Sequence, residues 1–204
     1  MRSWLSTSVV VVAVVAIVVV AGTVVAVAAA DVSPTGLTVN SHQTSEQTLD
    51  SELKGFAGSS YFQQAFQQNG LPFKTTPGAL DSVAGAQWIA LRIENQLAQQ
   101  ALAKEGTEVT QSDLDAARAS LQKSGVLAGM NSDASDQLVQ LQASVSKLGK
   151  AAGSTNAALA DLRQQAKKAD VTITPRYGTW DAKKIAVCPP GSCRRAVPVV
   201  PSTQ

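Results

Sequence analysis

The chain of 204 residues carries 17 Lys and Arg against 15 Asp and Glu, which gives a formal net charge of +2. This balance argues against nucleic acid as a partner, because a nucleic-acid-binding domain shows a basic stripe, and equally against a funnel for acidic substrates. The length allows one ordinary domain with appendages.

Residues 1–30 form the first predicted appendage. Arg2 is the one charged residue before Asp31, and residues 9–30 are an uncharged run dominated by Val and Ala. The run ends in three alanines, which are typical of a signal-peptidase site before Asp31. A cleaved signal peptide needs about 7–15 apolar residues and a transmembrane anchor about 20, so both alternatives stay open. Either one places the rest of the chain outside the cytoplasmic membrane, because Arg2 stays inside.

After a polar linker at 31–36, the hydrophobic pattern predicts a mainly α-helical domain. We expect helices at 45–56, 61–68, 80–105, 110–123, 135–150 and 155–169, and short strands at 37–40 and 171–174. The predicted helix at 80–105 is apolar on two sides, so we expect amphipathic helices to surround it as a long central helix.

The two predicted strands, 37–40 and 171–174, flank the whole set of helices. Two isolated strands of this length can hardly be stable alone. We therefore expect a two-stranded antiparallel β-pair that joins the ends of the domain. The alternative is that both segments are extended loops.

The sequence offers little for catalysis. Its one histidine, His42, lies in a polar loop without a second histidine or a serine in a nucleophile-elbow setting, so a catalytic triad is not indicated. Asp113 and Asp115 are two residues apart on a predicted helix and point to different sides, which excludes a metal or glycosidase pair there. No glycine-rich phosphate loop follows a strand. We expect no enzyme, no catalytic residue, no metal and no cofactor.

Cys188 and Cys193 are the only cysteines, and the intervening Pro-Pro-Gly-Ser favours a tight turn. In an oxidising compartment such a pair predicts a small local disulfide. A redox CxxC site needs two intervening residues, and a metal site needs two more ligands than this pair provides. We expect residues 182–204 to be a flexible tail that this disulfide shapes.

The few aromatic residues gather around one bend of the chain, at Tyr61, Phe62, Phe66, Phe73 and Trp88. Amide side chains are abundant on the predicted helices. Amide-rich walls with apolar patches suit loose binding of extended polypeptide, because amides pair with backbone groups. The alternative is an ordinary core with solvated faces, and composition alone favours that alternative.

Two strings carry a family resemblance. Residues 103–106 (AKEG), followed by 109–114 (VTQSDL), resemble a recurrent junction in the amino-terminal domain of SurA/PrsA-type extracytoplasmic foldases. Residues 171–181 (VTITPRYGTWD) are similar to the end of the SurA-like proteins of high-GC Gram-positive bacteria. The resemblance implies a helical chaperone domain at 37–181. The chain has no room for the family's parvulin-like domain, so prolyl-isomerase activity is not implied.

The resemblance leads to a hypothesis for the site. Trp88, Phe62, Phe66 and Tyr61 are expected to wall a peptide-binding groove between the central helix and its neighbours. We expect a second segment to dock back onto the helical body through Arg176, Tyr177 and Trp180. In this docking Trp180 is buried, and Arg176, beside Tyr177, stacks or pairs with a carboxylate. Ligand binding by these three is the less favoured alternative.

The expected function is that of an ATP-independent holdase for unfolded or nascent secreted polypeptides. It would act in the cell envelope, secreted or held on the membrane by an uncleaved amino-terminal segment. The alternative is a structural or adaptor module of the envelope that binds one dedicated partner. An enzyme is a third hypothesis, and it would depend on His42 as its only obvious base.

Overall fold

The computed structural model describes residues 33–76 and 79–200, apart from the side chain of Thr76. These residues belong to one compact unit. The predicted leader at 1–30 lies outside the described residues. Within the described ranges, no helix combines the length and the hydrophobicity that a membrane span requires.

The described part is mainly helical, with small antiparallel sheets. Its helices are α1 (Glu46–Ala57), α2 (Ser60–Gln68), α3 (Ser82–Lys104), α4 (Gln111–Lys123), α5 (Ser132–Ala151) and α6 (Thr155–Ala166). Its strands are β1 (Thr35–Val39), β2 (His42–Ser45), β3 (Lys74–Thr76), β4 (Ala79–Leu80), β5 (Val171–Ile173), β6 (Thr179–Asp181), β7 (Ala186–Cys188) and β8 (Val197–Pro198).

Each helix begins at a residue whose side chain accepts a hydrogen bond from a backbone N–H of the first turn. The capping residues are Ser45, Ser59, Asp81, Thr110, Asn131 and Ser154. At α4 the cap is reciprocal, because the Asp113 carboxylate also accepts from the backbone N–H of Thr110. These caps satisfy N–H groups that have no partner within the helix, and they fix where each helix starts.

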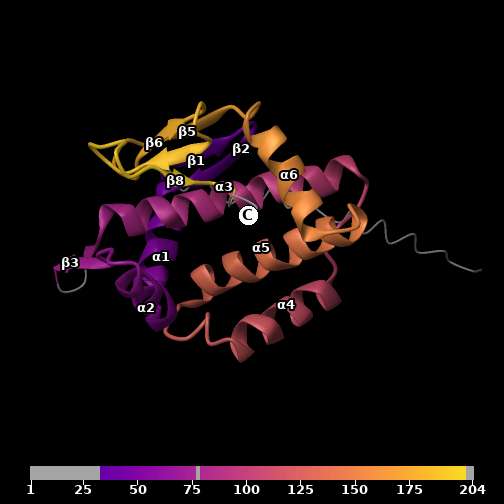
Figure 1. The fold of residues 1–204 in the computed structure, drawn as a ribbon, viewed down its shortest axis with the longest axis horizontal. Coiled ribbons are helices and arrows are strands. Elements are labelled where there is room, and N and C mark those ends of the chain that lie inside the picture. The colour runs from indigo at the N-terminus through magenta and orange to yellow at the C-terminus, as the bar shows by residue number, and fades with distance from the viewer. Residues whose placement is uncertain (1–32, 77–78, 201–204) are drawn as a thin grey trace, which may run out of the picture. The chain divides into compact units, whose positions relative to one another are not determined.

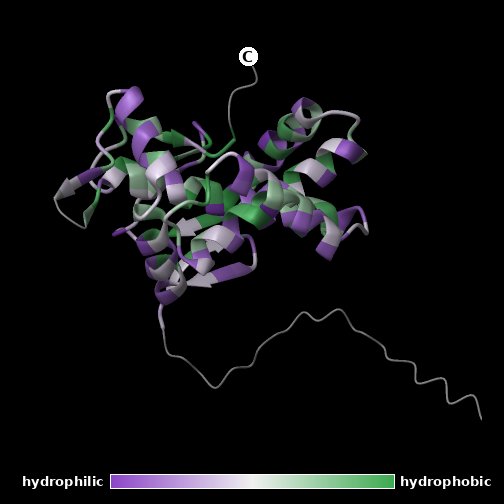
Figure 2. Cartoon of the chain, turned by 90° about the horizontal axis from the view of Figure 1, so that it is seen from below, coloured by the Kyte–Doolittle hydropathy of each residue, from purple (hydrophilic) through white to green (hydrophobic). Residues whose placement is uncertain are grey.

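Helix α3 packs against other elements on two sides. Figure 1 shows strands β1, β2, β5, β6 and β8 on one side of α3 and helices α5 and α4 on the other. Contacts join α3 to α1, α5 and α6, and to strands β1, β7 and β8. The side chains of Trp88, Ile89, Ile93 and Leu97 are therefore almost completely buried. Figure 2 shows hydrophobic and hydrophilic positions alternating along the helices, as expected for helices with one buried face.

The predicted pairing of the two strands is present, but their sheet has three strands. Leu37 of β1 lies opposite Ile173 of β5, and β2 pairs with the other edge of β1. The sequence predicts a polar loop where β2 lies, because the one buried side chain of β2 is that of a threonine. Thr44 lies against α3, where its hydroxyl accepts a hydrogen bond from Gln96 at 2.9 Å.

The prediction of a flexible tail is wrong for residues 182–200, because these residues are part of the folded domain. The domain therefore extends beyond its predicted end at Asp181. Strands β6, β7 and β8 form an antiparallel sheet in that order. Val187, Val197, Val199 and Val200 are buried in the same core as α3. These valines cover apolar surface of α3 that the predicted helices leave open, which gives the segment a fixed position.

Candidate peptide-binding groove

The predicted aromatic wall is an interior cluster. Trp88 has no exposed surface, and its ring lies 4.9 Å from that of Phe56. Phe66 is 9% exposed and packs on Phe73, while Phe62 is half-buried against Phe56. Trp88 and Phe66 therefore line no open groove. The spacing of the aromatic residues indicates which of them share one side of a helix. It cannot show whether other helices cover that side.

Tyr61 differs from the other aromatic candidates. It is 44% exposed, and its ring lies 5.4 Å from that of Phe62 in an edge-on arrangement. Of the four residues proposed from the sequence, Tyr61 is the one that offers substantial surface to a partner.

A buried polar network stands beside the aromatic cluster and joins α1, α3 and α5. The Glu52 carboxylate accepts a hydrogen bond from Trp88 Nε1 at 3.1 Å and pairs with Arg92 at 3.1 Å. Burial raises the pKa of Glu52, and the nearby Arg92 guanidinium opposes that shift. Gln137 Oε1 accepts hydrogen bonds from Arg92 and Asn95. The network links three helices, with Arg92 Nε and Gln137 Nε2 left without a hydrogen-bond partner among the described residues, and we assign it a structural role.

A groove of about 810 Å³ lies elsewhere along α3, over its carboxyl-terminal half. Its walls come from α3, from the turn between β1 and β2, and from the carboxyl-terminal end of α6 with the residues that follow. The lining residues are Asn40, His42, Leu97, Gln99, Gln100, Ala103, Lys104, Gln164, Gln165, Lys168 and Ala169. This volume lies within the range of about 300–1,000 Å³ that is usual for ligand sites.

Gln100 is held in a defined orientation at this groove. Its amide nitrogen lies 3.2 Å from the Val39 carbonyl oxygen and 3.2 Å from His42 Nδ1. Its amide oxygen accepts a hydrogen bond of 2.5 Å from Asn40 Nδ2. Asn40 adopts a left-handed backbone conformation with φ of 56°, which asparagine tolerates. This conformation reverses the chain direction between β1 and β2. The turn thereby brings polar groups from β1 and β2 onto one face of α3.

The groove is lined by amide side chains and carries positive charge. Lys104 and Lys168 belong to its wall, and the described residues that line it include no carboxylate. His42 meets Gln100 there, and no serine, threonine or cysteine is among the described lining residues. The arrangement offers amide donors and acceptors for a polypeptide backbone, with a few apolar side chains between them.

Arg176 and Tyr177 dock their segment onto α1, as the sequence analysis expects. The Arg176 guanidinium pairs with Glu46 at 2.8 Å and with Asp50 at 2.9 Å, and it lies 4.4 Å from the centre of the Tyr177 ring. The Tyr177 hydroxyl donates to Asp50 Oδ1 at 2.7 Å. Burial and this bond raise the pKa of Tyr177 above its ordinary range. Trp180 is half-buried against the main core.

One group of metal-ligating side chains exists among the described residues. It consists of Asp181, Cys188 and Cys193, and none of the three lines the groove. Cys188 and Cys193 form the disulfide that the sequence predicts.

Comparison with known proteins adds no assignment. No protein-family model matches the sequence, and neither a curated protein nor a solved structure matches the chain.

Proposed function

We propose that this protein is an extracytoplasmic peptide-binding chaperone, without prolyl-isomerase activity, that holds extended segments of unfolded or nascent exported polypeptides. The observation that carries the proposal is the amide-lined groove over the carboxyl-terminal half of α3. The resemblance of residues 103–114 and 171–181 to the SurA/PrsA-type chaperone domain supports it.

In this proposal the groove recognises backbone rather than sequence. Gln99, Gln164 and Gln165 present amides that can both donate to and accept from the peptide groups of an extended segment. Leu97 and Ala103 provide apolar contacts for the client's side chains.

The edge strand β2 extends this surface. β2 lies at the outer position of its sheet, and its first residue, His42, belongs to the groove wall. A client segment that leaves the groove can therefore continue along β2 and add a strand to the sheet, which supplies main-chain hydrogen bonds without regard to sequence.

A second candidate is the adaptor module with one dedicated partner. One observation favours it: among the described residues, Tyr61 is the single exposed large hydrophobic side chain. A holdase that accepts many clients uses exposed apolar surface, which is scarce here.

The test compares residues 31–204 with a groove variant, Gln164→Ala with Gln165→Ala. We expect the parent to suppress aggregation of a reduced secreted protein and to bind a panel of fluorescent unstructured peptides. Loss of two amide partners, at about 0.5–1.5 kcal/mol each, weakens peptide binding about tenfold. The matched control, Gln64→Ala with Gln122→Ala, removes two exposed amides outside the groove.

Three results separate the hypotheses. No suppression at stoichiometric excess, together with no peptide binding, contradicts the chaperone proposal. Tight capture of one envelope protein without affinity for the peptide panel supports the adaptor. Equal peptide binding by the groove variant and the parent, with both folded by circular dichroism, removes the groove as the site. Amino-terminal sequencing of the mature protein with membrane fractionation tests the proposed location.

A further inference from the structure

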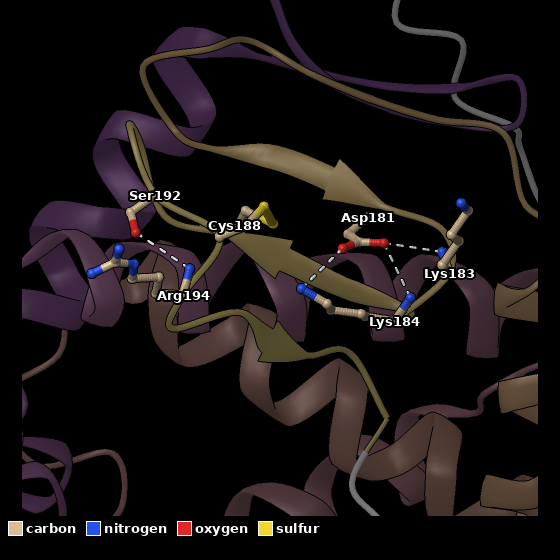
Figure 3. Close-up of a disulfide and its surroundings, with 7 residues drawn as sticks. Asp181, Lys183, Lys184, Cys188, Ser192 and Arg194 are labelled. Carbon is tan, nitrogen blue, oxygen red and sulfur yellow. Dashed lines mark hydrogen bonds and ion pairs between the residues drawn. A yellow bond between two sulfur atoms is a disulfide. The ribbon is translucent and has the colours of Figure 1, made fainter.

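The carboxyl-terminal sheet brings three metal-ligating side chains together. Asp181 ends β6, Cys188 ends β7, and Cys193 lies in the loop that leads to β8 (Figure 3). One ligand atom from each lies within 4.8 Å of the other two. Strand pairing explains the first two: Thr179 lies opposite Cys188, so Asp181, two residues along β6, points to the same face of the sheet. The sequence predicts a disulfide and no metal site at the two cysteines, and only the fold brings Asp181 beside them.

The Asp181 carboxylate is oriented by its own turn. Its Oδ1 accepts hydrogen bonds from the backbone N–H groups of Lys183 and Lys184, each at 3.1 Å. Its Oδ2 lies 3.5 Å from the Lys184 ammonium, and Figure 3 shows these contacts on one side of the carboxylate. Bonds of this kind orient the ligands of protein metal sites and increase their affinity.

The two cysteines differ in accessibility. Cys188 is 1% exposed, whereas Cys193 lies in an exposed loop that includes Gly191 with φ of 78°. A small reductant can therefore reach the bond at Cys193. After reduction, two sulfur atoms and a carboxylate share one small volume, and Lys184 is the one cation paired with Asp181 there. If both thiols ionise, three negative charges lie together, an arrangement that a divalent cation stabilises.

We propose that reduction of the Cys188–Cys193 disulfide converts this part of the sheet into a binding site for a thiophilic divalent cation of the Zn²⁺ class. The cation is held by the two cysteine thiolates and the Asp181 carboxylate, with water in the fourth position. Zinc–ligand bonds of about 2.0–2.3 Å place tetrahedral ligands about 3.3–3.8 Å apart, so the two sulfur atoms must separate by roughly 1.7 Å from a bonded distance of about 2.05 Å. The exposed Cys193 loop can supply this movement. Sulfur ligands favour Zn²⁺ over Mg²⁺ and Ca²⁺.

The chemistry balances in three steps. A phosphine reductant donates two electrons to the sulfur–sulfur bond and becomes a phosphine oxide with oxygen from water, while the water's two protons give two thiols. Binding of the cation then releases those two protons to solvent and forms two metal–thiolate bonds. Molecular oxygen then accepts two electrons from the two thiolates and two protons from solvent to give hydrogen peroxide, which restores the disulfide and releases the cation.

The experiment uses the full-length chain in a mild detergent, reduced by phosphine that is removed under anaerobic conditions, and Co²⁺ as a spectroscopic substitute for Zn²⁺. We expect a sulfur-to-cobalt charge-transfer band and intense visible bands of tetrahedral Co²⁺, both lost on addition of Zn²⁺. The oxidised chain gives neither. Asp181→Asn weakens Co²⁺ binding at least tenfold, and Cys188→Ser abolishes the charge-transfer band. Asp170→Asn, an exposed aspartate outside the site, binds like the parent.

Two results overturn the proposal. One is a reduced parent chain that shows no charge-transfer band. The other is a Co²⁺ affinity of Asp181→Asn that equals the affinity of the parent, because the two cysteines would then bind the cation without the Asp181 carboxylate. Circular dichroism follows the fold in parallel. A reduced chain that loses structure must regain it with Zn²⁺, and failure to do so also contradicts the site.

Discussion

Replacement of Glu94 by glutamine tests how the interior of this protein treats a buried charge. Glu94 lies in the middle of α3 and is 6% exposed. Burial raises its pKa from 4.5 to about 7, because the charged form loses its hydration there. Glutamine keeps the size and removes the charge.

The magnitude and sign follow from linkage. A pKa raised by about 2.5 units corresponds to about 3 kcal/mol of differential stability, at roughly 1.36 kcal/mol per unit. The folded state keeps a proton that the unfolded state releases. The contribution of Glu94 is therefore fully present below about pH 4.5 and is lost as the pH rises to about 7. We expect Glu94→Gln to match the parent near pH 4 and to exceed its free energy of unfolding by about 3 kcal/mol at pH 8.

The assay is urea unfolding of the disulfide-bonded protein at several pH values between 4 and 8, followed by tryptophan fluorescence. The difference between variant and parent isolates Glu94 from other titrating groups. Glu105→Gln, at the exposed end of the same helix, is the control for the removal of a solvated carboxylate. A difference between Glu94→Gln and the parent that is the same at pH 5 and pH 8 would refute the reasoning.

Further predictions concern close packing and one hydroxyl. Gly58→Ala destabilises the protein by about 1–3 kcal/mol, because a Cβ there would lie 2.1 Å from the carbonyl oxygen of Gly129. Gly85→Ala, with open space around it inside α3, instead raises the melting temperature and adds about 0.5–1 kcal/mol; if both substitutions act alike, the steric explanation fails. Tyr177→Phe removes the donor to Asp50 and lowers the free energy of unfolding by about 1 kcal/mol in urea, and an unchanged value would mean that the bond contributes nothing.

The helices could be predicted from the sequence because their signals are local. Apolar spacing and capping residues such as Thr110 lie within one helix, so no knowledge of partners is needed. The sheet of β6, β7 and β8 was missed for the opposite reason. Val187 and Val197 form strands only because β7 has a neighbour on each side and α3 beneath it, and that information is spread over the whole chain.

The groove could not be located from the sequence. The abundance of amides was compatible with backbone recognition, but composition alone favoured an ordinary core with solvated faces. Asn40, Gln100 and Gln165 come from three separate elements whose meeting no short window of sequence records. The aromatic residues misled because size and spacing indicate burial and binding equally well. Trp88 is buried against Phe56 and Glu52 of α1.

The order in which the chain leaves the ribosome gives the β1–β5 pairing a further consequence. Leu37 cannot meet Ile173 until the helices that lie between them in the sequence have been made, and the valines at 197–200 that cover α3 come later still. Contacts between positions so far apart in the sequence form slowly. The sheet that joins the ends of the domain therefore cannot form while these helices are still being synthesised.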